Sequence, residues 1–331
     1  MTTINGYKII GELNNANSGF SKWGFAKKGK KEFFIKELIT PVYPIDDGAM
    51  SPEYIAQRRA YCDEYERNFR DFYNSINEAS HGTLVRIVEF FRHESRYYVV
   101  TEKINGISLF DSSVRSLPLD KKLLFLKTIV LCFCDLHSAN IVHFDVKPNN
   151  ILVKRTDSGS FCAKLIDFDS GFFKGKVITI DELCGDLTYL APEVFLAIIG
   201  ETVHLDEKAD IYSLGLVMHE YLCGKLPNFD TNEFEYPYEA ALEHGKLVCD
   251  STVQPVELQQ LITSMLDANP DNRPSSWHIF NALNTMCTGI PSTFTEPVRE
   301  PISYVPPAPV SRPDAAPAKK VDAWFSAAGD L

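Results

Sequence analysis

The sequence predicts an α+β protein of two lobes, in which a small β-rich N-terminal lobe with one long helix precedes a larger helical lobe. Three observations lead to this prediction. Residues 4–40 contain short apolar runs punctuated by glycine, as strands do. An apolar stripe at helical spacing follows them, and after Gly106 the pattern stays mostly helical to about residue 287. The 331 residues are enough for two core-forming units.

The long helix is predicted to begin after Ser51. The run Ser51-Pro52-Glu53 combines an N-cap residue, a proline at the first helical position and an acidic first turn. Residues 84–91 and 97–101 are predicted to form a pair of strands after this helix. The apolar stripe of the helix consists of Tyr61, Tyr65, Phe69, Phe72 and Ile76.

These patterns place the N-terminal lobe at residues 7–104 and the helical lobe at residues 105–287. The composition then changes, because eight of the 19 prolines lie in residues 288–331. Such a segment cannot build a core, and we expect an extended tail. Near its end Trp324-Phe325 fits a docking peptide for a partner, while the alternative is an apolar pair that packs on its own domain or has no role.

Composition argues against several classes of function. The 33 basic and 44 acidic residues give a formal net charge of −11, which disfavours a general grip on nucleic acid. The most apolar run, residues 123–142, is interrupted by Lys127 and Asp135 and is expected to be a core helix rather than a membrane span. The eight cysteines contain no CxxC pair, and no signal-peptide pattern opens the chain. We therefore expect buried, reduced thiols in a cytoplasmic protein.

The run from His143 to Asn150 is the densest group of chemistry-bearing residues. Asp145 supplies a carboxylate that can orient a hydroxyl and accept its proton, and Lys147 supplies a cation for a moving phosphate. Asn150 offers an oxygen ligand to Mg²⁺, and Asp167, at the end of an apolar strand, offers a second one. Together these residues predict phosphoryl transfer.

These residues resemble the motifs of eukaryotic-type serine/threonine protein kinases. The match covers about residues 7–287 and implies the bilobal protein-kinase fold, the use of ATP and Mg²⁺ (or Mn²⁺), and protein substrates that carry serine or threonine. His143, Asp145, Lys147 and Asn150 match the catalytic loop, and Asp167-Phe168 matches the metal-binding triplet. The other matches are Ala191-Pro192-Glu193, the helix from Asp210 to Gly215, and Arg273, which in this family usually pairs with the glutamate here numbered 193.

In the N-terminal lobe the resemblance assigns Lys36 to the α- and β-phosphates. Its partner should be a glutamate on the long helix, for which we favour Glu66 over Glu64. The backbone of Glu102 and Ile104 would face the adenine as the hinge, and Leu152 also falls at a nucleotide-binding position.

The phosphate-covering loop departs from the family. Ser18, Gly19 and Phe20 fall within it and are expected to contact the nucleotide, but Ala16, Ser18 and Ser21 replace its three glycines. Glycine lets backbone amides approach phosphate closely, so their loss predicts a weaker grip on ATP. Trp23 replaces the valine of this loop pattern. Phe34 replaces a small residue that in this family normally packs on adenine, which predicts a narrower adenine slot or a shifted sheet.

Three further departures concern regulation. Phe144 stands where many members have an arginine that orders a phosphorylated activation loop, so we expect activity without that route. Asp169 replaces the glycine of the metal-binding triplet, which should alter the balance between its conformations. Asp186 stands where a threonine usually bridges Asp145 and Lys147; an aspartate there could reach Lys147, or Thr188 could substitute.

The sequence therefore predicts a protein kinase that acts on serine or threonine, because Lys147, two residues after the base, is the serine/threonine version of this loop. One alternative is a pseudokinase, a binding scaffold on the same fold, which the altered phosphate loop and Phe34 favour. A kinase of small molecules is a weaker alternative, because Glu193, Asp210 and Arg273 belong to the protein-kinase pattern.

Overall fold

The computed structural model describes residues 2–14, 21–46, 48, 50–179, 183, 185–292 and 294. These residues form two compact units. The first takes the described residues of 1–74 and 86–103, and the second takes those of 75–85 and 104–304. Ser18, Gly19, Phe20 and the Trp324-Phe325 pair lie outside the described residues.

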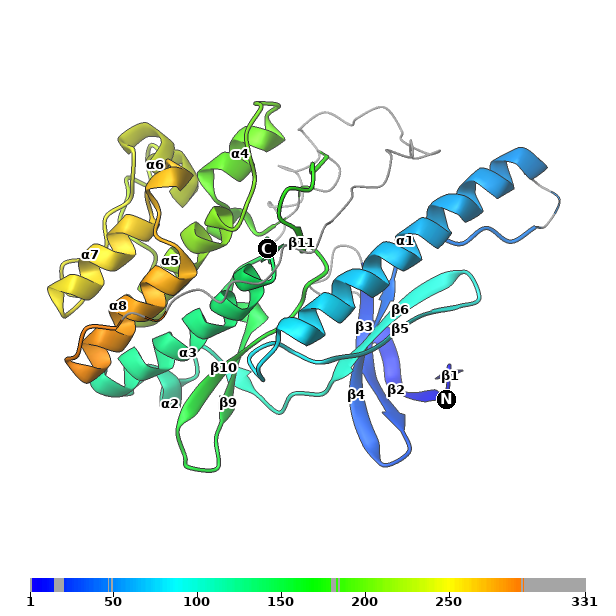
Figure 1. The fold of residues 1–331 in the computed structure, drawn as a ribbon, viewed down its shortest axis with the longest axis horizontal. Helices are drawn as coiled ribbons and strands as arrows, with labels where there is room; N and C mark the ends of the chain where they lie inside the picture. The colour runs from blue at the N-terminus through cyan, green and yellow to red at the C-terminus, as the bar shows by residue number, and fades with distance from the viewer. Residues whose placement is uncertain are drawn as a thin grey trace. The chain divides into compact units, whose positions relative to one another are not determined.

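The first unit contains an antiparallel sheet, in which six described strands follow the order β1-β2-β3-β4-β6-β5 (Figure 1). Alternation of side chains gives this sheet two different faces. Ala26, Ile35 and Val100 belong to the buried apolar cluster on one face. Lys36 lies on the other, directly opposite Trp23 and Val99. The strands are β1 (Thr3–Ile4), β2 (Tyr7–Asn14), β3 (Ser21–Lys28), β4 (Lys31–Leu38), β5 (Ile87–His93) and β6 (Arg96–Glu102).

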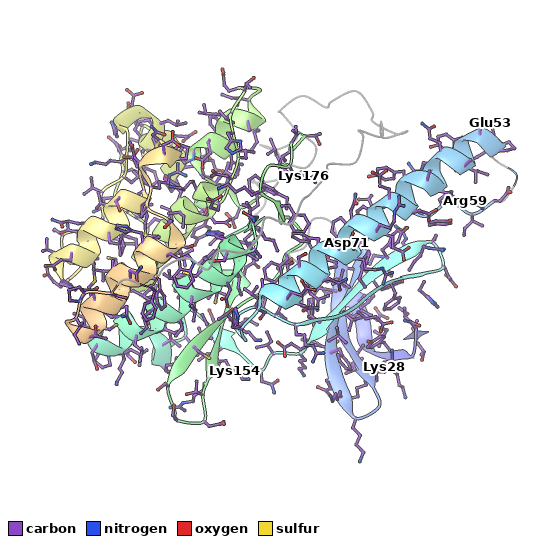
Figure 2. All side chains as sticks on the ribbon, viewed as in Figure 1. Lys28, Glu53, Arg59, Asp71, Lys154 and Lys176 are labelled. Carbon is purple, nitrogen blue, oxygen red and sulfur yellow. The ribbon has the colours of Figure 1, made fainter. Side chains whose placement is uncertain are left out.

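Helix α1 (Pro52–Ala79) begins where the sequence predicts. The backbone N–H of Tyr54 donates to Ser51 Oγ at 3.3 Å, so Ser51 acts as the N-cap. Figure 2 shows Glu53 in the acidic first turn and Asp71 further along the helix. The predicted stripe is confirmed as the buried side, because Phe72 and Ile76 are buried and the ring of Phe69 lies 6.1 Å from that of Phe90 on β5.

The second unit is mainly helical. Lys127 Nζ donates to Asn284 Oδ1 at 3.0 Å, and Trp277 Nε1 donates to Ser138 Oγ at 2.9 Å, so α3 and α8 run antiparallel side by side (Figure 1). The longer elements are α3 (Leu119–Ser138), β9 (Ile151–Arg155), β10 (Phe161–Leu165), α4 (Pro192–Ile198), α5 (Lys208–Cys223), α6 (Pro237–His244), α7 (Val256–Met265) and α8 (Ser276–Thr288). The short ones are β7 (Ile107–Ser108), α2 (Ser112–Arg115), β8 (Ile141–Val142), η1 (Pro148–Asn150), β11 (Phe172–Phe173), η3 (Leu187–Tyr189) and η4 (Pro270–Asn272).

These two units confirm the predicted α+β fold, a β-rich part with one long helix and a larger helical part, but one strand boundary is wrong. The sequence predicts a strand over residues 84–91, whereas β5 begins at Ile87. The backbone of the preceding residues pairs elsewhere: the N–H of Val85 donates to the carbonyl of Leu165 at 2.8 Å, and the N–H of Leu165 donates to that of Thr83 at 3.0 Å. The helical unit also contains the β9–β10 hairpin, on which Lys154 lies (Figure 2).

None of the described helices is both long and apolar enough to cross a bilayer. The seven cysteines within the described residues are free. Four of them are buried, as expected, whereas Cys162 and Cys223 are half-buried and Cys287 is exposed.

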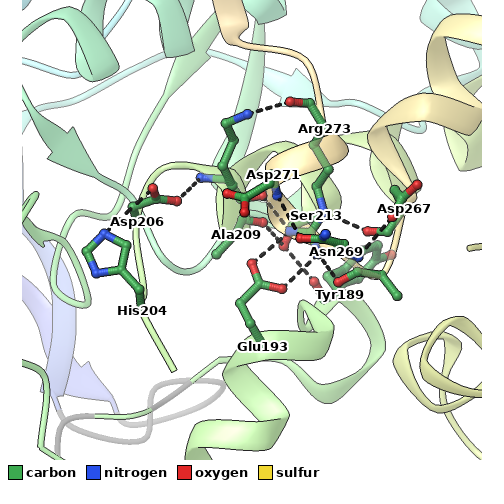
Figure 3. Close-up of polar contacts among 12 residues, drawn as sticks. Tyr189, Glu193, His204, Asp206, Ala209, Ser213, Asp267, Asn269, Asp271 and Arg273 are labelled. Atoms are coloured by element: carbon green, nitrogen blue, oxygen red, sulfur yellow. Dashed lines mark hydrogen bonds and ion pairs between the residues drawn. The ribbon is translucent and has the colours of Figure 1, made fainter. Parts of the chain in front are cut away.

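A buried ion pair joins α4 to the turn η4. Arg273 donates from Nη1 to Glu193 Oε1 at 2.7 Å and from Nη2 to Glu193 Oε2 at 2.8 Å, and both side chains are nearly inaccessible (Figure 3). The backbone carbonyls of Asp267, Ala268 and Lys208 accept the remaining guanidinium N–H groups. The pairing that the resemblance implies is therefore confirmed, with all polar atoms of the guanidinium satisfied.

Replacing Arg273 with alanine should lower the free energy of unfolding by about 3 to 5 kcal/mol, because it leaves the Glu193 carboxylate buried and unpaired. Urea unfolding of the variant beside Arg155→Ala, an exposed control on β9, measures this loss. The double variant Arg273→Leu/Glu193→Leu should regain part of it, since no buried charge remains. An Arg273→Ala protein within about 1 kcal/mol of wild type would contradict the assignment.

Candidate active site

One buried carboxylate holds the loop that carries Asp145. Asp210, in the first turn of α5, accepts the backbone N–H of His143 at Oδ2 and that of Phe144 at Oδ1, both at 2.8 Å. Its Oδ2 also lies 3.0 Å from His137 Nε2 at the end of α3. Phe144 has φ +66°, in the left-handed region that costs a side-chain-bearing residue energy. The two hydrogen bonds hold the backbone in that turn, and the next side chain is Asp145.

Three of the predicted site residues contact one another on this loop. Lys147 Nζ lies 3.0 Å from Asp145 Oδ2. Asn150 Nδ2 donates to Asp145 Oδ2 at 2.9 Å and to the Asp145 carbonyl at 2.7 Å. Both of these partners can only accept from Asn150, so the amide nitrogen faces Asp145 and its Oδ1 is left for another donor or a cation. Asp145 keeps an oxygen, Oδ1, with which to meet a hydroxyl.

The second candidate metal ligand, Asp167, is tied to the first through the backbone. The N–H of Ile166 donates to the carbonyl of Asn150 at 3.0 Å, and the carbonyl of Ile166 lies 3.0 Å from His143 Nε2. Asp167 follows with φ +65°, a strained value of the kind that collects at functional sites. These backbone contacts therefore fix the position of the end of β10 relative to the loop that carries Asp145.

The oxygens of Asn150 and Asp167 fit Mg²⁺, a hard cation that takes one or two protein oxygens and completes its shell with phosphate and water. Within the described residues no group of three or more His, Cys, Asp or Glu side chains could hold a metal by itself. A divalent ion held by Asn150 and Asp167 would complete its shell with phosphate oxygens and water, as Mg²⁺ usually does in phosphoryl transfer.

Two other predicted residues of the second unit lie close together. Ile104 and Leu152 meet at Gly106, where a side-chain Cβ would approach Leu152 Cβ to 3.1 Å and Ile104 Cγ2 to 3.4 Å. A larger residue at 106 would therefore push these two apart.

The first unit carries Lys36, Glu66 and Glu102. Lys36 lies on β4, and Glu66 on α1 accepts a hydrogen bond from Arg70 at 2.8 Å, one turn further along the helix. The backbone N–H of Glu102, on β6, donates to the carbonyl of Arg86 at 3.0 Å. The Glu66 carboxylate thus pairs with Arg70 on its own helix.

Aromatic rings cover the sheet face that bears Lys36. The rings of Trp23 and Phe34 stack with centroids 5.7 Å apart, and Phe25 meets Phe34 edge-on at 5.9 Å. Residues opposite each other in the ladder share a face, and Trp23 lies opposite Lys36 while Phe25 lies opposite Phe34. An aromatic strip therefore adjoins the lysine.

The segment after Asp167 is held by contacts that sequence reasoning missed. Strand β11 pairs with β8, and the ring of Phe172 meets that of Phe144 edge-on at 5.1 Å. Lys174 Nζ lies 2.6 Å from Glu207 Oε1. Although burial acts to raise the pKa of Glu207, the Lys174 hydrogen bond holds that pKa below its ordinary value of 4.5. The Lys174–Glu207 partners are separated by 33 residues, with no sequence signal that links them.

The loop before α4 differs from expectation at Asp186. Its Oδ1 accepts the backbone N–H of Thr188 at 3.0 Å and caps η3, while the described partner of Lys147 is Asp145. Among the described residues Asp186 makes this local turn contact and no contact with Lys147. Ser213 Oγ on α5 donates to the carbonyl of Tyr189 at 2.6 Å and holds the end of the loop (Figure 3).

This chain matches one protein-family model and is similar to several known proteins. A family model described as protein kinase domain matches residues 51–284. Serine/threonine-protein kinase chk-2 of Caenorhabditis elegans is 29% identical over 318 residues, which cover 91% of this chain and 62% of that protein. Serine/threonine-protein kinase ULK1 of Homo sapiens is 31% identical over 212 residues, 60% of this chain and 19% of the relative.

A third similar protein is a probable serine/threonine-protein kinase KIN1 homolog of Encephalitozoon cuniculi. It is 26% identical over 273 residues, which cover 82% of this chain and 44% of that protein. The chain thus spans less than two thirds of the length of each of these relatives.

Replacing Asn150 with aspartate should lower the free energy of unfolding at pH 7 by about 1 to 3 kcal/mol, because a second carboxylate would face Asp145 where a donor now lies. The loss should shrink toward pH 4, since protonation of either carboxylate restores a donor. Urea unfolding at both pH values, with Asn149→Asp on the exposed neighbouring position as control, measures it. Equal behaviour of the two variants would rule out the contact.

Replacing Lys174 with methionine should lower the free energy of unfolding at pH 7 by at most about 1 kcal/mol, because the lysine is part-exposed. The lowered pKa of Glu207 gives a stabilisation that is present above its unfolded value of 4.5 and is lost as the pH falls through the folded value. The difference between wild type and Lys174→Met should therefore vanish in acid. Lys154→Met, on an exposed strand, is the control, and a difference that grows in acid would contradict the ion pair.

Proposed function

The chain belongs to the protein kinase domain family, and on that premise we propose that it transfers the γ-phosphoryl group of ATP to serine or threonine hydroxyls of protein substrates. The observation that carries this proposal is the contact of Asp145 with Lys147 and Asn150 on a loop tied to Asp167. A proton acceptor, a cation and two oxygen ligands are what phosphoryl transfer requires.

Each residue then has one role. Asp145 orients the substrate hydroxyl and accepts its proton through the oxygen that Asn150 and Lys147 leave open. Lys147 neutralises charge on the moving phosphoryl group, which passes to the substrate oxygen while ADP leaves. Asn150 and Asp167 hold Mg²⁺, or Mn²⁺ in its place, and the ion neutralises phosphate charge when bound.

We extend the proposal to the residues that would contact the nucleotide. Lys36, oriented by Glu66, contacts the α- and β-phosphates, and Ser18, Gly19 and Phe20 cover them. The backbone of Glu102 and Ile104 meets the adenine, and Leu152 packs beneath it. Ile104 and Leu152 both border Gly106, which is consistent with their facing one ligand.

Activity is proposed not to need a phosphorylated activation loop. The position before Asp145 carries the Phe144 ring, which packs on Phe172 instead of offering a cation. The Lys174–Glu207 ion pair and the pairing of β8 with β11 hold the segment after Asp167 in place without a phosphate group.

A pseudokinase is the second candidate, and the stacked Trp23 and Phe34 rings favour it. They occupy the sheet face that bears Lys36, where a bulky strip would restrict an adenine base. A kinase of small molecules is less well supported, because the Glu193–Arg273 pair is built as in protein kinases.

The remaining proposals concern organisation. We assign the kinase lobes to residues 7–104 and 105–287 and a tail with a Trp324-Phe325 docking peptide to residues 288–331. A cytoplasmic location is proposed from the free thiols of the described cysteines.

Asp145→Asn should lower the rate of phosphoryl transfer to a generic basic protein about 10²- to 10⁴-fold, because the proton acceptor is lost. Transfer from radiolabelled ATP with Mg²⁺ measures this, beside Asp157→Asn, an exposed carboxylate on the β9–β10 turn. Asp167→Ala should lose transfer to a similar extent. If wild type gives a nucleotide-dependent rise in melting temperature but no transfer to itself or to substrate, the pseudokinase is correct.

A further inference from the structure

Asn281, Thr285 and Thr288 form a polar stripe on α8. Their positions, i, i+4 and i+7, place the three side chains on one face of the helix. All three remain at least partly exposed. The family model ends its match at residue 284, so the last two members of the stripe lie beyond the part of the chain that the model covers.

The chain reverses after α8 and returns along this stripe. Gly289 ends the helix with φ +69°, the left-handed value that a C-terminal cap requires. Alternate residues facing one way are typical of extended backbone, which advances about 6.4 to 6.8 Å over two residues, close to one turn of helix. Three alternate backbone N–H groups each donate to one member of the stripe: Ile290 to Thr288 Oγ1 at 3.3 Å, Ser292 to Thr285 Oγ1 at 3.0 Å and Phe294 to Asn281 Oδ1 at 3.0 Å.

Asn281 contacts the returning chain as a neighbouring strand would. Besides accepting the N–H of Phe294, its Nδ2 donates to the Phe294 carbonyl at 2.8 Å, so one side-chain amide satisfies both backbone groups of one residue. Two further contacts involve side chains. Ser292 Oγ donates to Asn281 Oδ1 at 2.8 Å, and the Phe294 ring meets that of Phe280 edge-on at 5.8 Å. The surface thus contacts a hydroxyl and, two residues later, an aromatic ring.

We propose that this face of α8 is a docking surface for an extended peptide of the pattern Ser-x-Phe, and that Ser292 and Phe294 of the same chain occupy it. The occupant follows from the contacts and from the short connection after Thr288, which keeps the segment at a high effective concentration. Docking holds the first residues after α8 on the helical unit. This inference does not depend on phosphoryl transfer.

Proteolysis of the intact protein measures the docking. Chymotrypsin can cleave after Phe294 only when the segment leaves the surface, so the cleavage rate follows the undocked fraction. A synthetic peptide of residues 289–300 gives the rate for the same sequence without α8. The full chain should be cleaved after Phe294 at least about tenfold more slowly than the peptide, because several hydrogen bonds of about 1 kcal/mol each must open. This protection should be equal in dilute and concentrated samples.

Asn281→Leu removes three of these hydrogen bonds and should raise the cleavage rate about tenfold. Asn74→Leu, the same change at an exposed position on α1, should leave the rate as in wild type. Ser292→Val removes the hydroxyl and should raise the rate about threefold, whereas Ser292→Thr keeps the hydroxyl and should stay within about twofold of wild type. Each Ser292 rate is divided by that of a peptide with the same substitution.

Wild-type cleavage after Phe294 as fast as that of the free peptide, or a rate that Asn281→Leu leaves unchanged, would overturn the docking surface. Equal rates for Ser292→Val and Ser292→Thr would overturn the recognition of serine. Protection that arises only in concentrated samples would assign the surface to a second copy of the chain and overturn docking within one chain.

Discussion

The carboxylate of Asp210 accepts two consecutive backbone N–H groups, and the geometry of the candidate active site depends on this interaction. Phe144 adopts a left-handed conformation, and the backbone amides of His143 and Phe144 both donate to this one carboxylate. A buried amide without a partner costs about 1 to 3 kcal/mol, and hydrogen bonds to a charged acceptor are stronger than neutral ones. The buried charge of Asp210 is in turn offset by these donors and by His137.

A series of hydrogen bonds links this turn to the proposed catalytic residues. The side chain of Asn150 donates to both the carbonyl and the carboxylate of Asp145. These two hydrogen bonds hold residues 145–150 as a closed loop. The carbonyl of Asn150 then accepts the backbone N–H of Ile166, which ties the loop to the residue after β10. One turn further along the same side of α5, Ser213 donates to the carbonyl of Tyr189. One helix therefore positions both the proposed base and the substrate-side loop.

How well the sequence predicted these features depended on the range of the interaction. Helix α1 could be predicted because its N-cap and apolar stripe are local patterns. The distant pair Glu193–Arg273 could be predicted only through the resemblance, since 80 residues separate its members. Lys174–Glu207 has neither a local pattern nor a motif, and the contact that Asp186 makes is a local capping bond to Thr188.

The start of β5 was misplaced for a similar reason. Leu84 and Val85 read as strand residues, but Leu165 at the end of β10 takes the backbone hydrogen bonds of Thr83 and Val85, on either side of Leu84. The residue types therefore predicted extended backbone without revealing which strand it pairs with.

Amide hydrogen exchange of the intact protein at His143 and Phe144 tests the central claim most directly. If Asp210 holds this turn, these two loop amides exchange as slowly as those in the middle of α5, because only large-scale opening releases them. In Asp210→Asn they should exchange much faster, while amides of α8 keep their wild-type rates. Fast exchange of both amides in the wild-type protein would contradict the account.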